Sequence, residues 1–131
     1  MSQHQQEQPL ALIIEDDYDA SVIFDEALQA AGFSTEVFRD GKKALTRLDG
    51  SVPHLIALDL HLPHVSGSTI LNKIRLDERL CDISVIIVTA DPSLADSLHE
   101  NADLILLKPI SFKQLRDLAA RLHPPDIVGE N

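Results

Sequence analysis

The sequence predicts a doubly wound α/β protein, in which helices cover both faces of a five-stranded parallel sheet. Two observations lead to this prediction. Five short apolar segments alternate with five segments of helical spacing, without an internal repeat. Three of the apolar segments are nearly continuous in Leu, Ile and Val, which is typical of strands buried on both faces of a parallel sheet. A chain of 131 residues is long enough for one such domain with a substantial core.

The expected strands are the segments LALIIE, STEVF, HLIALD, ISVIIVT and DLILL, at residues 10–15, 34–38, 54–59, 83–89 and 103–107. We expect right-handed crossovers between them. In the strand order 2-1-3-4-5, the first, third, fourth and fifth strands lie side by side. The carboxyl ends of these strands would then meet at one edge of the sheet, where open α/β sheets place their sites.

Apolar residues at helical spacing mark the segments between the strands. The first helix is indicated by Ile23, Ala27, Ala30 and Ala31, and Gly32 ends it. The other helices are indicated by Ala44, Leu45 and Leu48; by Ile70, Leu71 and Ile74; by Leu94, Ala95 and Leu98; and by Leu115, Leu118, Ala119 and Leu122. The fourth group is the weakest of these.

The polar segment at residues 1–9 is expected to be a disordered leader, residues 10–122 the domain, and residues 123–131 a tail or the start of a linker. No apolar run is long enough to span a bilayer, and the first residues lack the order of a signal peptide. We therefore expect a cytoplasmic protein that does not contact a membrane. The net charge of −10 argues against nucleic acid as a direct partner, because a phosphate backbone requires a basic face.

Polar residues follow four of the expected strands. The sequence Glu15-Asp16-Asp17 follows the first, and Asp59 ends the third. Thr89 ends the fourth, and Lys108 follows the fifth. Each feature has an ordinary structural explanation: an acidic residue such as Asp17 or Asp19 caps a helix, a threonine ends a strand, and a Lys-Pro pair forms a turn. Their convergence at one edge of the sheet favours a functional site.

The chemistry of this set is coherent. Clustered carboxylates repel one another and require a cation, and an oxygen-rich site with few protein ligands suits Mg²⁺. A carboxylate beside such a metal can attack a phosphoryl group and become an acyl phosphate. The oxygens of the transferred group then need positive charge and hydrogen-bond donors, which Lys108 and Thr89 can supply. Ala90 is small enough to leave room for a phosphoryl donor.

The segments ALIIEDD, LIALDLHLPHVSG, VIIVTA and LLKP, in this order and spacing, resemble the response-regulator receiver domain of two-component signalling, over residues 10–122. The resemblance implies a flavodoxin-like fold with strand order 2-1-3-4-5. It implies that Asp59 is the phosphoacceptor, and that Glu15, Asp16, Asp59 and the backbone carbonyl of His61 surround Mg²⁺. Thr89 would be the switch hydroxyl and Lys108 the partner of the phosphoryl group, with a cis peptide bond before Pro109.

The sequence departs from the family pattern at several points. Glu15 stands where many members have aspartate, so we expect it to reach the metal through water. His61, two residues after the acceptor, either overhangs the phosphoryl group or is an exposed loop residue. His61 and His64 together do not make a zinc site. The stretch between Thr89 and Lys108 is shorter than usual and has Ile105 where an aromatic residue is common, so the fourth helix is expected to be short.

These features predict a receiver domain that is phosphorylated on Asp59 by a histidine kinase or phosphotransfer protein and changes its affinity for an unidentified downstream protein. It would take part in its own phosphorylation and dephosphorylation without being a conventional enzyme. One alternative is an interaction module that keeps only the fold. Another is a phosphohydrolase of the haloacid-dehalogenase type, which requires a second aspartate where this chain has His61. A flavodoxin is disfavoured by the lack of a phosphate loop rich in Ser, Thr and Gly after the first strand.

Overall fold

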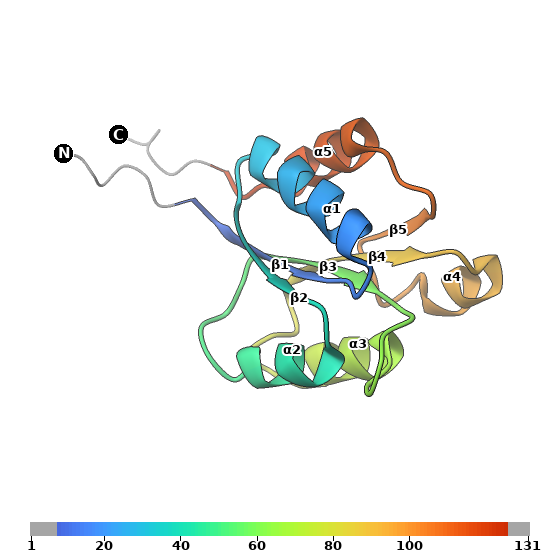
Figure 1. Ribbon diagram of the computed structural model, residues 1–131. Coiled ribbons are helices and arrows are strands. Elements are labelled where there is room, and N and C mark those ends of the chain that lie inside the picture. Colours follow the sequence, from blue (N-terminus) through green and yellow to red (C-terminus); the bar gives the residue numbers. More distant parts are fainter. Residues whose placement is uncertain (1–7, 126–131) are drawn as a thin grey trace.

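The computed structural model describes residues 8–125, which alternate strictly between strands and helices (Figure 1). The elements are β1 (Leu10–Ile14), α1 (Tyr18–Ala30), β2 (Ser34–Phe38), α2 (Gly41–Arg47), β3 (Leu55–Asp59), α3 (Gly67–Leu76), β4 (Ser84–Thr89), α4 (Pro92–Leu98), β5 (Leu104–Leu107) and α5 (Phe112–Arg121). Most of the predicted leader (1–9) and of the predicted tail (123–131) lies outside the described residues. Within the described part, no helix has the length and apolar character that a membrane span requires.

The strands form one parallel sheet in the order β2-β1-β3-β4-β5, as predicted. β1 pairs with β3 in the register Ile14 to Leu58, and β3 pairs with β4 in the register Asp59 to Val88. The last pair of β4 and β5 joins Thr89 to Leu107. The carboxyl ends of these four strands are therefore level with one another, and the residues that follow them share one edge of the sheet.

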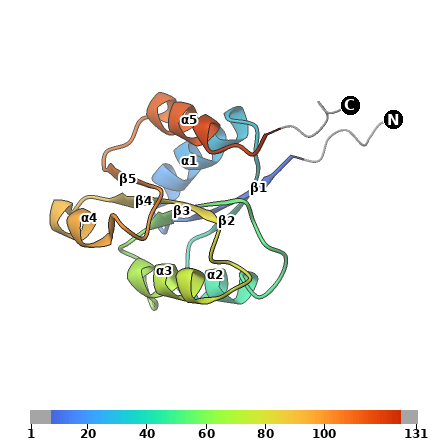
Figure 2. The ribbon, with the colours of Figure 1, turned by 180° about the vertical axis from the view of Figure 1, so that it is seen from behind.

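Helices cover the two faces of this sheet separately. Figures 1 and 2 show α1 and α5 together on one face, and α2 and α3 together on the other. Alternate residues of each strand serve the two faces: Ala11 and Ile13 belong to the core beneath α1 and α5, whereas Leu12 and Ile14 belong to the core above α2 and α3. Burial on both sides explains why the central strands read as continuous apolar runs.

The first helix was predicted correctly, but its buried face only in part: Ala27 is buried and Ala31 is half-buried against the core, as the predicted stripe requires. The buried residues of α1 are Ser21, Phe24, Ala27 and Leu28, whereas Ile23 is 39% exposed and Ala30 is exposed. Phe24 and Leu28 bury more apolar surface than the alanines of the predicted stripe, and this difference sets the rotation of the helix. Ile23 consequently lies on the outer surface near the site.

Each helix begins with an acidic or hydroxyl residue that caps it. The capping side chains belong to Asp17, Asp40, Ser66, Asp91 and Ser111, and each accepts a hydrogen bond from a backbone N–H of the first turn. Because every helix follows the carboxyl end of a strand, these caps surround the same edge of the sheet as the polar strand ends. The prediction that Asp17 or Asp19 caps the first helix is confirmed for Asp17.

Candidate phosphoacceptor site

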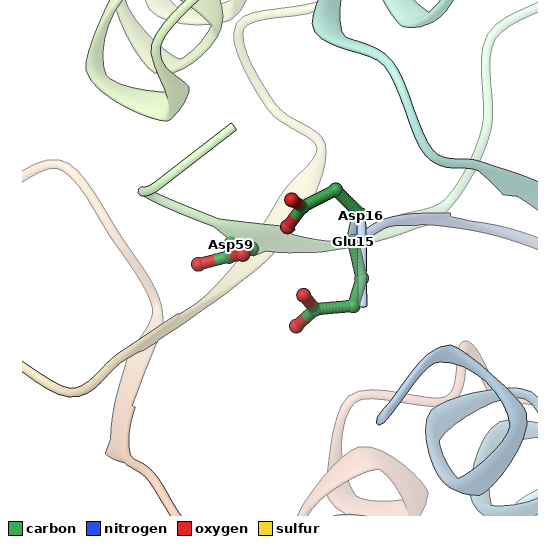
Figure 3. A group of neighbouring side chains, drawn as sticks. All are labelled: Glu15, Asp16 and Asp59. Atoms are coloured by element: carbon green, nitrogen blue, oxygen red, sulfur yellow. The ribbon is translucent and has the colours of Figure 1, made fainter. Parts of the chain in front are cut away.

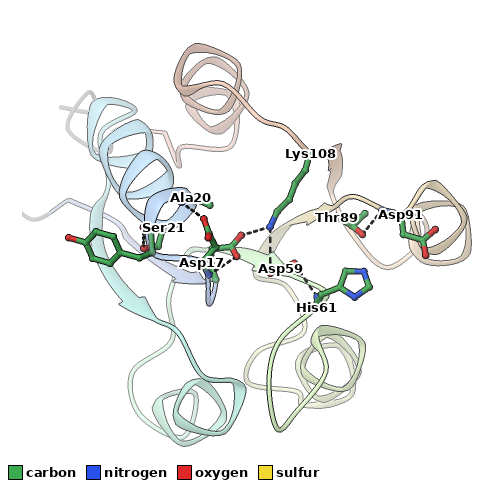
Figure 4. Close-up of polar contacts among 10 residues, drawn as sticks. Asp17, Ala20, Ser21, Asp59, His61, Thr89, Asp91 and Lys108 are labelled. Atoms are coloured by element: carbon green, nitrogen blue, oxygen red, sulfur yellow. Dashed lines mark hydrogen bonds and ion pairs between the residues drawn. The ribbon is translucent and has the colours of Figure 1, made fainter.

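Four strand ends bring the predicted site residues together. Lys108 extends from the end of β5 toward Asp59, which ends β3 (Figure 4). Its Nζ lies 3.6 Å from Asp59 Oδ2 and 2.9 Å from Glu15 Oε1. Lys108 thus connects the residue that follows β1 with the last residue of β3. The peptide bond before Pro109 is cis, as predicted, and the Lys108 N–H donates to Thr89 O at 2.8 Å.

Three of these groups are removed from solvent. Glu15 is 1% exposed, Asp59 is 3% exposed and Thr89 is fully buried. Burying a carboxylate is costly unless nearby charges or hydrogen bonds compensate it. Here two buried carboxylates share one ammonium group, so the site holds more negative than positive charge. This imbalance distinguishes the site from a simple structural ion pair.

The charge imbalance shifts the pKa values of Glu15 and Lys108. Burial, the nearby Asp59 side chain and its charge raise the pKa of Glu15 from 4.5 to about 7, against the opposing effect of the hydrogen bond from Lys108. Burial disfavours the ammonium form of Lys108, but the hydrogen bond and charge of Glu15 and the charge of Asp59 outweigh it, and the pKa of Lys108 is raised. Without a further cation, the site therefore favours binding a proton at Glu15.

The side chains of Glu15, Asp16 and Asp59 form a cluster that could hold a metal ion. One carboxylate oxygen from each lies within 4.8 Å of the others, and all three point toward a common space (Figure 3). Asp16 is exposed, whereas the other two are buried. Glu15 Oε1 is buried and pairs with Lys108 Nζ at 2.9 Å, and no other donor of the described residues reaches it. This oxygen-only donor set with excess negative charge fits a hard divalent cation.

The loop after Asp59 is built closely around the carboxylate of that residue. The backbone N–H of His61 donates to Asp59 Oδ1 at 3.0 Å, so the two carboxylate oxygens have different partners. A side chain at Gly67 would place its Cβ 2.4 Å from the backbone oxygen of Asp59, which explains why glycine begins α3. The His61 side chain is exposed. In the described part of the chain, neither His61 nor His64 belongs to a cluster of three potential metal ligands.

Thr89 and the short α4 occupy the neighbouring part of this edge. The Thr89 hydroxyl accepts a hydrogen bond from the Asp91 N–H at 3.1 Å (Figure 4). Asp91 caps α4, and hydrogen bonds from the Ser93 side chain and backbone lower its pKa. The helix itself has only seven residues, none of them buried, which confirms the prediction of a short fourth helix.

A model of the response regulator receiver domain matches residues 11–120. The chain belongs to this family. The receiver domain is therefore a phosphoacceptor module of two-component signal transduction, and it has the fold, strand order and family that the sequence predicts.

Curated relatives support this assignment. The receiver domain is 33% identical to the probable methanogenesis regulatory protein FilR2 of Methanothrix harundinacea over 82% of this chain and 76% of that protein. It is 36% identical to the DNA-binding dual master transcriptional regulator RpaA of Synechocystis over 82% of this chain and 46% of that protein. It is 31% identical to the sensor histidine kinase TmoS of Ectopseudomonas mendocina over 99% of this chain, but spans only 14% of that kinase.

Solved structures share the fold. The receiver domain of a putative LuxO repressor protein from Vibrio parahaemolyticus is 29% identical and superposes with a TM-score of 0.79, over 88% of this chain and 90% of that chain. The Mn²⁺-bound form of response regulator Rcp1 is 25% identical, with a TM-score of 0.73 over 87% of this chain and 91% of that chain. The acidic cluster of the present chain thus belongs to a fold of which a metal-bound example is known.

Sequence reasoning identified each residue of the central cluster but missed several contacts around it. The Asp17 N–H donates to Glu15 Oε2 at 3.2 Å and orients that side chain. His64 Nδ1 lies 3.4 Å from Asp40 Oδ2, and this contact joins the loop after Asp59 to the start of α2. The first contact is local to the turn after β1, whereas the second leaves no signal in the sequence because it depends on how loops from different strands meet.

Proposed function

We propose that Asp59 is the residue that accepts the phosphoryl group in this receiver domain. The observation that carries the proposal is the position of Asp59: its carboxylate is buried at a strand end, between an acidic pair and a lysine whose Nζ lies 3.6 Å away. Asp59 is the only carboxylate of the described residues that both joins the acidic cluster and ends the central strand of the sheet. Glu15 and Asp16 lie on the adjoining turn.

The proposed transfer uses an Asp59 carboxylate oxygen as the nucleophile. A bond forms between this oxygen and phosphorus as the bond between phosphorus and the donor's histidine nitrogen breaks. The electron pair of the broken bond remains on the imidazole, which then takes up a proton. Lys108 balances charge on the phosphoryl oxygens, and the Thr89 hydroxyl, whose oxygen accepts from the Asp91 N–H, donates a hydrogen bond to one of them.

We further propose that the acidic cluster binds Mg²⁺. The side chains of Asp16 and Asp59 and the backbone carbonyl of His61 would hold it, and Glu15 would act through water. Bound Mg²⁺ would neutralise charge on the carboxylates and on the phosphoryl oxygens. Glu15 shares its one cationic partner, Lys108, with Asp59, and the pKa of Glu15 is raised; both observations support a site that lacks a second cation.

A hollow beside Lys108 supports docking of the donor protein at this edge. It has a volume of about 540 Å³ and is lined mostly by apolar side chains; its lining comprises Asp17, Asp19, Ala20, Ile23, Phe24, Ala90, Lys108, Pro109 and Ile110. Because Lys108 belongs to both the hollow and the acceptor site, a donor that fills the hollow would bring its phosphohistidine close to Asp59. We propose that a histidine kinase or histidine phosphotransfer protein docks here.

The remaining parts of the proposal follow from the chemistry. The domain takes a chemical part in its own phosphorylation and hydrolysis and does not turn over a separate substrate. Phosphorylation changes its affinity for a downstream protein, and the strongly negative net charge disfavours direct contact with nucleic acid. The cytoplasmic location predicted from the sequence stays a prediction.

Incubation with acetyl phosphate and Mg²⁺, followed by intact-mass measurement, tests the assignment of the acceptor. The parent should gain one phosphoryl group, and the Asp59→Asn variant should gain none while keeping its circular dichroism spectrum. Free turnover of many phosphomonoesters would instead indicate a phosphohydrolase. A parent that neither gains mass nor turns over substrate would indicate an interaction module, and labelling of Asp59→Asn to the parent's extent would show another acceptor.

Docking is tested by comparing two phosphoryl donors. Replacing the half-exposed Ile23 by aspartate should slow transfer from a phosphorylated histidine phosphotransfer protein tenfold or more, on the scale of about 1.4 kcal/mol for each factor of ten. Labelling by acetyl phosphate should stay within twofold of the parent, because a small donor does not need the hollow. Equal rates from the protein donor for both chains would place its docking surface elsewhere.

A further inference from the structure

The loop after Asp59 is connected to α2 by a contact that lies outside the acceptor site. His64 Nδ1 is 3.4 Å from Asp40 Oδ2. The other oxygen of the same carboxylate, Oδ1, accepts the Lys42 N–H at 2.8 Å and caps α2. Asp40 therefore has its first oxygen fixed by the helix, while the second faces a histidine from a different loop.

The backbone of His64 makes this contact unusual. Its φ of 69° lies in the left-handed region, and His64 is the only residue other than glycine with positive φ in the described part of the chain. Glycine or asparagine adopts this conformation at lower cost than other residues. The left-handed backbone conformation of His64 costs conformational free energy. A favourable contact made by its side chain would offset part of this cost.

The same loop packs tightly on both sides. A Cβ added at Gly41, the first residue of α2, would lie 2.6 Å from the backbone oxygen of Val65. At its other end, the Gly67 N–H donates to Leu60 O at 3.1 Å, and the His61 N–H donates to Asp59 Oδ1 at 3.0 Å. A shift of the His64 turn relative to α2 would therefore move the backbone that holds the Asp59 carboxylate.

We infer that His64 is a positioning residue, which in its protonated form pairs with Asp40 and holds the loop at residues 60–66 in place around Asp59. The charged groups recorded around this contact are the Asp40 carboxylate and, in α2, Lys43. Hydrogen bonding from the Lys42 backbone and from His64 lowers the pKa of Asp40, so this carboxylate stays charged throughout the range in which a histidine titrates. The contact should therefore strengthen as pH falls through that range.

This inference concerns the geometry of the loop, and only its consequence for phosphorylation rests on the proposed function. Two conservative variants isolate the contact. Asp40→Asn keeps an N-cap side chain but removes the negative charge. His64→Asn keeps a residue that tolerates positive φ but removes the titrating group. The double variant completes a cycle that measures their coupling.

Amide hydrogen exchange of His61 and Gly67 in the unphosphorylated, metal-free protein gives the primary measurement, at about pH 5.5 and pH 8, on either side of the ordinary histidine pKa. At the lower pH, each single variant should exchange these amides about two- to fivefold faster than the parent, the range expected for an exposed ion pair. Exchange of these amides in the double variant should be no faster than in either single variant. At the higher pH, all four proteins should have the same exchange rates. The Leu122 N–H, which donates to Ala119 O, serves as a remote control and should not change.

The rate of acetyl phosphate labelling provides the second measurement and should show the same dependence on pH and the same lack of additivity. Additive effects, or differences of equal size at both pH values, would overturn the pairing of His64 with Asp40. Changed exchange with unchanged labelling rates would overturn the positioning role. A parent that takes up no phosphoryl group would refute the proposed function, while the exchange measurements would still decide the pairing.

Discussion

The acceptor site and the region of α4 and β5 lie at neighbouring parts of the same edge, but they are built very differently. At the acceptor site, buried Glu15 and Asp59 meet Lys108 at 2.9 and 3.6 Å. In the neighbouring region, α4 has seven residues and none is buried, and β5 has four residues, of which only Leu106 is buried. The chain thus places a buried cluster of charged side chains beside a short, exposed helix and a short strand.

The difference suggests that reaction and readout are separated in this receiver domain. In the family, the switch hydroxyl moves toward the phosphoryl group, and an aromatic residue on the fifth strand packs into the space that it leaves. Thr89 can make the first movement because its hydroxyl can donate to a phosphoryl oxygen. Ile105, half-buried on β5, lacks the large ring and polar tip needed for the second. The response to phosphorylation should therefore concentrate in the loops after Asp59 and Thr89.

The largest effect that we expect is a pH dependence of the free energy of unfolding that comes from the titration of Glu15. Its pKa is 4.5 in the unfolded chain and about 7 in the folded protein, so between these values the folded state holds a proton that the unfolded state has lost. The free energy of unfolding should therefore fall by up to about 3 kcal/mol as pH rises from 4.5 to 7, and this contribution is fully present only below 4.5.

Chemical denaturation of the metal-free parent and of the Glu15→Gln variant, across this pH range, measures the effect. The variant lacks the titrating group, so its stability relative to the parent should rise as pH increases, while the exposed carboxylates contribute equally to both proteins. A constant difference in the free energy of unfolding between the two proteins across this pH range would show that folding does not raise the pKa of Glu15.

The next effect is the stabilisation by Mg²⁺. Binding to the folded state alone should add about 2.7 kcal/mol at a hundredfold excess over Kd, which raises the melting temperature by several degrees. Asp16→Ala should remove most of this rise, because it removes one of the clustered carboxylates. Asp19→Ala, which removes a nearby carboxylate outside the cluster, is the matched control and should keep the rise. Equal stabilisation of the Asp16→Ala variant and the parent would place the metal elsewhere.

A smaller effect is expected at His61, whose exposed side chain follows the acceptor by two residues. It can either order or exclude the water that hydrolyses the acyl phosphate. His61→Asn should change the rate of dephosphorylation several-fold in one direction, which corresponds to about 1 kcal/mol in the barrier. His99→Asn, at the exposed end of α4, is the control and should have the parent's half-life. Identical half-lives for His61→Asn and the parent would make His61 an ordinary loop residue.

The two regions also differ in how far they could be predicted. Asp59, Thr89 and Lys108 were identified because each directly follows or ends a strand, and parallel strands bring their carboxyl ends to one edge. The shortness of α4 was predicted because the stretch between Thr89 and Lys108 is shorter than the family pattern. The pairing of His64 with Asp40 was not predictable, because it depends on the contact of two loops. Part of the buried face of α1 was missed because the helical spacing of Ile23 competes with that of the larger Phe24.

Amide chemical shifts with and without beryllofluoride and Mg²⁺ test the separation of reaction from readout most directly. We expect large changes in the loops at residues 60–66 and 90–91, and small changes at Ile105 and along α5 (Phe112–Arg121). Changes at Ile105 and throughout α5 as large as those beside Asp59 would contradict this separation.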